Sequence, residues 1–173
     1  MTVHVVPSAA RLSAFRIARL VDRLQAHAPG LDDLLVQEFF LVQTLDDAEV
    51  DRAALRRLLG EGPEALPDAP ARVFVVPRLG TVSPWSSKAT DIARVCGITG
   101  VRRVELARVV IPQGVQALGA AALAELHDPM MESVLTDPAQ LPHLFDTQRR
   151  RPLRRVPVQA GGREALLLSL IHI

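Results

Sequence analysis

One segment of the chain, residues 77–92, gathers residue types that could bind an anion. It has the sequence PRLGTVSPWSSKATDI and leads from a buried type of strand through a turn into the start of a helix. Unpaired backbone N–H groups and the positive end of the helix dipole attract anions at such a start. Neighbouring hydroxyls and a basic side chain would complete a pocket for a phosphate or a carboxylate. The candidate binding residues are Arg78, Thr81, Ser83, Ser86, Ser87 and Lys88.

The same segment also has a purely structural interpretation. Ser83 or Ser86 could cap the helix, and Pro84 could occupy its first turn, where a missing N–H costs nothing. Trp85 would then belong to the core. The segment is not a Walker A loop, because the spacing G-x-x-x-x-G-K-[ST] is absent. Capping and anion binding both remain open at this point.

Lys88 is the only lysine among the twenty basic residues, and it lies near the only tryptophan and the only cysteine. Codon bias in an arginine-rich chain could produce the same scarcity, so the count only directs attention to this helix. Its apolar positions follow helical spacing, which predicts a buried stripe of Trp85, Ala89, Ile92 and Cys96. Lys88 falls outside that stripe.

The sequence predicts no catalytic residue and no metal site. His127 and Asp128 resemble half of a metal or acid–base pair, but no second histidine stands three or four residues away, so a surface or helix-end histidine is expected. Cys96 continues an apolar stripe, which favours burial over nucleophilic use. A single cysteine excludes an internal disulfide and a multi-cysteine metal site. The signatures G-x-S-x-G, C-x-x-C and H-E-x-x-H are also absent.

The elements that must position these residues alternate between strand and helix. Strands are expected at residues 3–6, 34–42, 72–76 and 101–111, and helices around residues 17–24, 50–58, 84–96 and 115–126. This order predicts an α+β fold of two pseudo-repeated strand-helix-strand-helix halves, with helices packed on a largely antiparallel sheet. The order of the elements supports the duplication, without a residue-level repeat.

Three local predictions accompany this scheme. Thr44 followed by Asp47 approximates a capping box that would open the second helix, and Gly60 would end it. Met130 and Met131 have the character of core-filling residues.

Charge divides the chain unevenly. The net charge is +1, but residues 147–173 hold six arginines against one glutamate, which is +5 and leaves −4 for residues 1–146. The stretch QRRRPLRRVPVQAGG is predicted to be an extended linker, and a nucleic-acid-binding arm is the alternative. No apolar run is long enough to span a membrane and no leader segment is evident, so a cytoplasmic location is expected.

The segment GTVSPWSSKATDIARVCG, residues 80–97, closely resembles the N-terminal domain of the large-type phosphoribosylformylglycinamidine synthase family, the formylglycinamide ribonucleotide amidotransferases. Residues 12–16 are similar to the opening helix of that family, and residues 125–132 (ELHDPMME) to its ELHDxMME motif. Residues 162–166 resemble the start of its linker region. The resemblance covers residues 8 to about 166.

The chain departs from the family pattern at three places. It has RLGT at residues 78–81 where the family has RPGT, Leu106-Ala107 where the family has Arg-Gly, and Pro129 where the family favours arginine. No arginine can therefore act at position 106 or 129. After Leu166 the family continues with a polar helix and a long catalytic region, so a truncated chain is expected, and the native status of the last seven residues stays open.

The resemblance implies a domain similar to a fused dimer of the small PurS subunit, over residues 1–145, and a basic linker with the start of a linker domain over residues 146–173. The complete enzymes convert formylglycinamide ribonucleotide, ATP and glutamine into formylglycinamidine ribonucleotide, ADP, phosphate and glutamate in purine biosynthesis. Their ATP, magnesium and glutaminase sites would lie in other regions, so this chain alone would be inactive and Cys96 would not be the glutaminase nucleophile.

The implied partners are the synthetase and glutaminase domains of the same chain, with no nucleic acid and no membrane. The helix start around Thr81 to Lys88 would then face the synthetase domain, so the six candidate residues could make an interdomain contact instead of binding an anion. A free-standing module that binds nucleic acid or protein through the basic tail is the alternative. If the partner domains are absent, an exposed apolar face is expected on the sheet or on the helix at residues 84–96.

Overall fold

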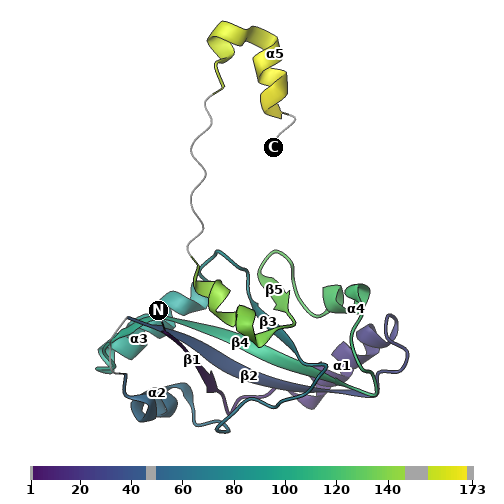
Figure 1. Cartoon of the computed structure of the whole chain (residues 1–173), viewed down its shortest axis with the longest axis vertical. Helices are drawn as coiled ribbons and strands as arrows, with labels where there is room; N and C mark the ends of the chain where they lie inside the picture. The colour runs from purple at the N-terminus through teal and green to yellow at the C-terminus, as the bar shows by residue number, and fades with distance from the viewer. Residues whose placement is uncertain (1, 46–49, 147–155, 171–173) are drawn as a thin grey trace.

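The computed structural model describes residues 2–45, 50–146 and 156–170, and this part of the chain holds one five-stranded sheet (Figure 1). All neighbouring strands are antiparallel, in the order β1 (Thr2–Pro7), β2 (Asp33–Thr44), β4 (Val101–Gln113), β3 (Val73–Pro77) and β5 (Glu132–Leu135). The helices are α1 (Ala14–Gln25), α2 (Arg52–Leu59), α3 (Pro84–Val95), α4 (Ala120–Glu125), the 3-10 helix η1 (Pro138–Phe145) and α5 (Val158–Leu170). The predicted α+β class with an antiparallel sheet is confirmed.

The two halves of the domain meet at the pair β2–β4, around Glu38 and Arg108. These two residues face each other in the register and lie 70 positions apart in the chain. The same offset of 70 relates the two 12-residue helices α1 and α3, whose N-caps are Ser13 and Ser83. Equivalent residues of the two halves are therefore 70 positions apart in the sequence. The sequence alone does not reveal this spacing, because few identical residues mark it.

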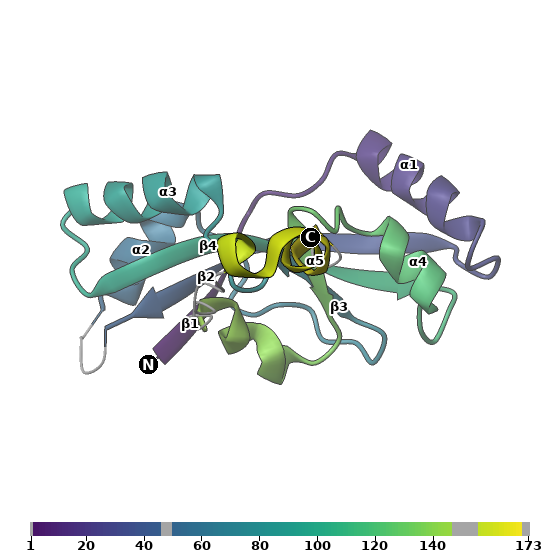
Figure 2. The same ribbon diagram turned by 90° about the horizontal axis from the view of Figure 1, so that it is seen from above.

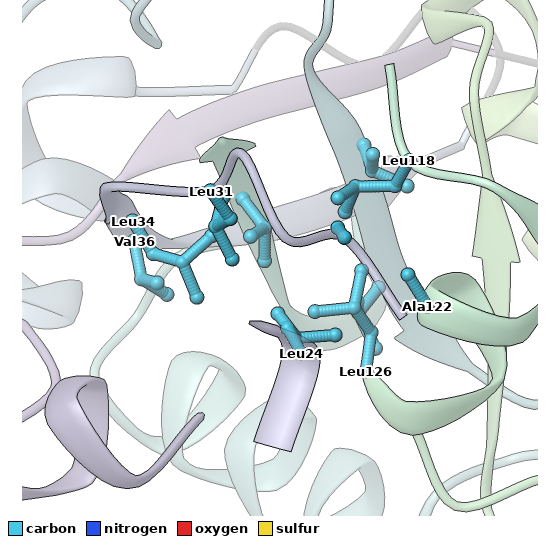
Figure 3. Packing of buried hydrophobic residues seen from close by; sticks show 11 residues of the cluster. Leu24, Leu31, Leu34, Val36, Leu118, Ala122 and Leu126 are labelled. Carbon is cyan, nitrogen blue, oxygen red and sulfur yellow. The ribbon is translucent and has the colours of Figure 1, made fainter. Parts of the chain in front are cut away.

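Four helices cover one face of the sheet in two pairs, each pair joining the two halves (Figure 2). Leu24 of α1 packs with Ala122 and Leu126, which lie on and just after α4 (Figure 3). At the other end of the sheet, α2 and α3 pack together through a second cluster. Both clusters use the same side of β2, since even-numbered residues of a strand share one face. Each half thus covers part of the sheet contributed by the other.

The opposite face of the sheet is covered by η1 and by the segment that precedes β3. Phe39 of β2 meets Phe74 of β3 edge to face, with ring centroids 6.0 Å apart. Leu141, Leu144 and Phe145 of η1 pack into the same cluster. The end of η1 therefore lies against the sheet beside the start of α3, where the candidate residues are found.

The start of α2 differs from the predicted capping box. The N-cap is Asp51, whose carboxylate accepts hydrogen bonds from the N–H groups of Ala53 and Ala54 at 2.9 and 3.0 Å. Thr44 remains in β2 and pairs with Thr2, while Asp47 lies outside the described residues. Gly60 follows the last residue of the helix with φ of 84°, as expected for a glycine at a helix end.

Two further boundaries differ from the sequence prediction. The helix expected from residue 115 begins only at Ala120, with Gly119 as its N-cap. The tail expected to be extended is helical from Val158, although the non-helical Gly162 (φ 55°, ψ −142°) divides that helix. Residues 147–155, which carry five of the six tail arginines, lie outside the described part. Within the described part, no helix is both long and apolar enough to cross a membrane.

Candidate functional site

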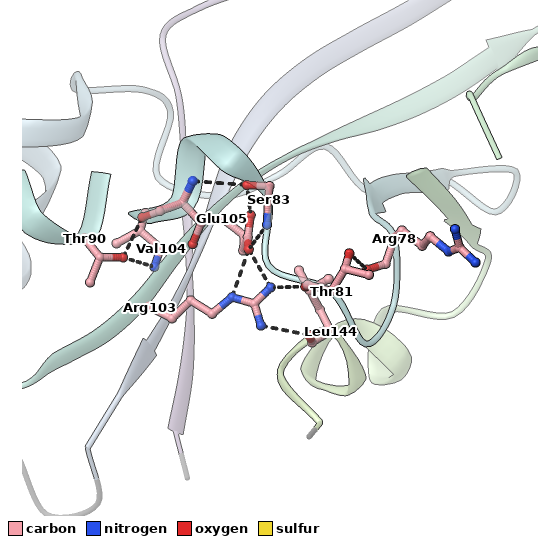
Figure 4. Close-up of polar contacts among 9 residues, drawn as sticks. Arg78, Thr81, Ser83, Thr90, Arg103, Val104, Glu105 and Leu144 are labelled. Carbon is pink, nitrogen blue, oxygen red and sulfur yellow. Dashed lines mark hydrogen bonds and ion pairs between the residues drawn. The ribbon is translucent and has the colours of Figure 1, made fainter. Parts of the chain in front are cut away.

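The start of α3 is built around the buried carboxylate of Glu105 (Figure 4). Glu105 lies on β4 and is 0% exposed. Its carboxylate accepts a hydrogen bond from the Ser83 hydroxyl at 2.5 Å and another from the Ser83 N–H at 3.2 Å. Negative charge is favoured at a helix N-terminus. The chain therefore places a carboxylate of its own beside the first turn of α3.

Arg103 balances the charge of Glu105 and ties three segments together. Its Nε donates to Glu105 Oε1 at 2.8 Å, and its Nη2 donates to the backbone oxygen of Thr81. Its Nη1 donates to the backbone oxygen of Leu144 at 3.4 Å, and the guanidinium lies 5.2 Å from the ring centroid of Phe145. A buried carboxylate is tolerated only when it is paired and hydrogen-bonded. This one connects β4, the turn before α3 and the end of η1.

Helix α3 buries four small residues, two of them hydroxyl-bearing, and leaves its large apolar side chains exposed. Its buried residues are Ser86, Ala89, Thr90 and Ala93. The predicted buried stripe was therefore wrong except at Ala89, because Trp85 is 40% exposed, Ile92 is 52% exposed and Cys96 is also exposed. The ring of Trp85 stacks on the ring of Phe40, with centroids 5.6 Å apart.

The edge of β4 explains why Ser86 and Thr90 lie on the buried side of α3. Strand β3 pairs with β4 only at residues 108–110, so the Val104 N–H has no strand partner. That N–H donates to the Thr90 hydroxyl at 3.1 Å, and the hydroxyl donates to the Ser86 carbonyl at 2.8 Å. A buried N–H without a partner costs about 1–3 kcal/mol. The helix thus turns a hydroxyl face toward the strand.

The turn before the helix places three of the six candidate binding residues as follows. Ser83 is the N-cap and accepts from the Ser86 N–H at 3.1 Å, which confirms the capping interpretation, and Pro84 is the first helical residue. The Thr81 hydroxyl donates to the Arg78 carbonyl at 2.7 Å within the turn. The side chain of Arg78 points away from Glu105 and Arg103 (Figure 4).

The other three candidates lie on α3 itself. Ser86 is buried, whereas Ser87 and Lys88 are exposed. Lys88 shares the outward face of the helix with Trp85 and Ile92, since residues three and seven positions apart lie on one side. An anion-binding or interdomain role for the six candidates remains a prediction.

Sequence reasoning missed Glu105 and Arg103 as members of this site. Both lie in VRRVELARVV, where positions 103 and 105 share one face of a largely apolar strand. Opposite charges two residues apart in a buried strand could have indicated this ion pair, because a buried carboxylate requires a partner.

The segment at residues 125–132 forms a second polar cluster, at the opposite end of the sheet. Arg108 donates to both carboxylate oxygens of Glu132, at 2.8 and 3.0 Å. Arg23 of α1 pairs with Glu125 at 2.7 Å, and the hydrogen bond and charge of Arg23 lower the pKa of Glu125. This motif therefore fixes α4 to α1 and to the central strand.

The structure decides two expectations about residues 125–132. Nδ1 of His127 lies 3.0 Å from the Leu123 carbonyl, to which it donates, and the residue follows the end of α4. The helix-end interpretation of His127 is confirmed. Met130 and Met131 are 72% and 55% exposed in the turn before β5, so their assignment to the core was wrong. Among the described residues, no group of three or more histidine, cysteine, aspartate or glutamate side chains could hold a metal ion.

The domain is therefore an α+β domain of two similar halves. Each helix pair takes one helix from each half, and carboxylate–guanidinium pairs stabilise the arrangement. A model of the family described as formylglycinamide ribonucleotide amidotransferase N-terminal matches residues 37–145, more than half of the chain. The chain belongs to this family, the N-terminal domain of phosphoribosylformylglycinamidine synthase, an amidotransferase of purine biosynthesis. The resemblance found in the sequence is confirmed.

Proposed function

We propose that this chain is a structural domain of a phosphoribosylformylglycinamidine synthase and docks through the outer face of α3 on the synthetase region. The complete enzyme would use ATP and glutamine to convert formylglycinamide ribonucleotide into formylglycinamidine ribonucleotide. Its ATP, magnesium and glutaminase sites would lie outside this chain. The domain would hold the synthetase in the arrangement that receives ammonia from the glutaminase.

The observation that carries this proposal is the orientation of helix α3, which leaves its large apolar side chains exposed. Its outer face presents Trp85, Ile92 and Val95 at 40%, 52% and 87% exposure, while its inner face holds the hydroxyls of Ser86 and Thr90. Contiguous exposed apolar side chains on a folded domain mark interaction surfaces. The exposed face was expected at this helix if a partner domain packs there.

The buried network fixes the start of α3 to β4 and to η1 within the domain itself. Ser83 is held by Glu105, and Arg103 ties the preceding turn to β4 and to η1. A surface that is already ordered loses less conformational entropy on association. The alternative of a nucleic-acid-binding module stays a prediction, because five of the six tail arginines lie outside the described residues.

The test is a charge placed on the outer face in the complete synthase. Val95→Asp should lower glutamine-dependent product formation at least about tenfold, since a buried unpaired charge costs more than 1.4 kcal/mol at an interface. Val95 is 87% exposed here, so the folding of the domain itself should be unaffected. Met130→Asp, at a residue 72% exposed in the turn before β5, is the matched control. Equal activity of the two variants would contradict the proposal.

A further inference from the structure

A groove lies between α3, the start of β4 and the end of η1, on a different side of α3 from the apolar face. Its volume is about 500 Å³. The residues that line it include Ser86, Ser87, Arg94, Arg102, Arg103 and Asp91. We propose that this groove binds a phosphate group carried by a small phosphomonoester.

Ser86 supplies the first argument. The residue is 1% exposed, yet its hydroxyl has no hydrogen-bond partner in the described part of the chain. Thr90, in the same wall of the groove, donates its hydroxyl hydrogen to the Ser86 carbonyl and accepts from the Val104 N–H, so its donor is already used. Buried hydroxyls in folded proteins are nearly always hydrogen-bonded. The unused donor of Ser86 therefore suits an acceptor oxygen that enters the groove.

The charges along the groove supply the second argument. Arg94 is paired with Asp91 at 3.3 Å, and Arg103 is committed to Glu105. Arg102 is exposed and makes no ion pair or hydrogen bond within the described residues. Three guanidinium groups thus face a single carboxylate in the groove, Asp91, and even with Glu105 behind Arg103 the charge remains positive.

The chemistry of these groups points to phosphate among anions. Guanidinium groups bind the oxygens of phosphate in a forked geometry, and hydroxyls donate to its remaining oxygens. A volume of about 500 Å³ falls in the usual range for small-ligand sites, about 300–1,000 Å³. Inorganic phosphate alone would leave much of this space empty, whereas a sugar phosphate would fill more of it.

This assignment goes beyond the docking proposal and can fail separately from it. The groove uses Ser86 and Arg102, whereas docking uses Ile92 and Val95. Arg102 and Val95 are both exposed, so a substitution at one should leave the other in place.

The experiment is a titration of the 173-residue chain followed by amide chemical shifts. Inorganic phosphate and ribose 5-phosphate are added at constant ionic strength, with acetate as the carboxylate control. Ribose 5-phosphate should shift the amides of residues 82–94 and 102–103 and bind more tightly than phosphate. Arg102→Ala and Ser86→Ala should each weaken binding about tenfold, the usual loss when a hydrogen bond to a charged group is removed.

Arg57→Ala is the matched control, because Arg57 is an exposed arginine on α2, away from the groove. It should leave the affinity unchanged. Arg102 is exposed, so its variant should fold even if Ser86→Ala does not. The proposal is overturned if ribose 5-phosphate shifts no amide of the groove, if acetate binds as well, or if Arg57→Ala weakens binding as much as Arg102→Ala. Tighter binding of ATP than of ribose 5-phosphate would overturn the assignment to a monoester.

Discussion

The hydroxyl of Ser83 donates to the carboxylate of Glu105 at 2.5 Å, across 22 residues of sequence. The same hydroxyl accepts from the Ser86 N–H and so caps helix α3. The buried strand residue thus holds the N-cap residue of α3 in place. The orientation of α3, with its apolar face outward, therefore depends on a charge inside the domain.

Removing the charge of Glu105 should destabilise the domain more than removing the cap. Glu105→Gln leaves Arg103 without its ionic partner at a site that is nearly buried, and such a loss costs about 3–5 kcal/mol. Ser83→Ala should cost about 1 kcal/mol, the usual value of a lost N-cap. Urea unfolding measures both. Glu61→Gln, at an exposed glutamate, is the control and should change the free energy of unfolding by less than about 0.5 kcal/mol. An equally small effect of Glu105→Gln would mean that the network is not a support of the fold.

Thr90 should be required for its hydroxyl rather than for its shape. Thr90→Val keeps the volume of the side chain but leaves the Val104 N–H unpaired in the interior, at a cost of about 1–3 kcal/mol. Thr90→Ser retains the hydroxyl and should cost less. Thermal unfolding of the two variants separates them, and an equal loss of Tm in both would contradict the role given to the edge of β4.

His4 should make the stability of the domain depend on pH. Partial burial, and secondly the charge of Arg52, lower the pKa of His4 below its ordinary value of 6.5. Arg52 can only donate, so the Nδ1 atom that lies 3.0 Å from it must be unprotonated. The folded state therefore resists a proton that the unfolded state accepts, and stability falls as the pH decreases below about 6.5.

Unfolding measured between pH 7 and pH 5 tests this sign. His4→Gln should flatten the decline in stability over that window. Arg52→Ala should flatten it only in part, because burial is the larger cause. A steeper decline in His4→Gln than in the unsubstituted chain would show that the sign is wrong.

Lys88 lies among the exposed apolar residues of α3, between Trp85 and Ile92. If this face docks on the synthetase region, the ammonium must find an acceptor there, and a charged hydrogen bond is worth about 1.5–3 kcal/mol. Lys88→Met in the complete synthase should therefore reduce glutamine-dependent activity by roughly tenfold or more, while the unfolding of the 173-residue chain stays unchanged. Arg57→Met serves as the control on an unrelated helix. Unaltered kinetics in Lys88→Met would remove this lysine from the interface.

The sequence predicted the strands and helices well where local rules decide them. Ser83 and Pro84 are typical of a helix start, and they form one. The rotation of α3 about its own axis could not be predicted. The expected buried stripe begins at Trp85 and the observed one begins at Ser86, one residue later, and both stripes contain Ala89. Hydrophobicity favours the stripe through Trp85, but the unpaired edge of β4, whose Val104 N–H donates to Thr90, favours the stripe through Ser86. That choice depends on tertiary contacts, which local periodicity does not contain.

The fixed spacing of the duplication was also hidden from pattern reasoning. Ser13 and Ser83 cap equivalent helices, yet serine is a common cap and carries little information by itself. Only the register, with Glu38 opposite Arg108, shows that the offset of 70 residues is shared by helices and strands.

The reactivity of Cys96 is the most direct measure of whether the outer face of α3 is buried in the complete enzyme. Cys96 ends this helix and is exposed as a free thiol in the domain. A maleimide reagent should label it readily in the 173-residue chain and much more slowly in the complete synthase, with the labelled peptide identified by mass spectrometry. Protection of Cys96 in the synthase, relieved by Val95→Asp, is the predicted result. Equal labelling rates in the chain and in the synthase would contradict docking through this face.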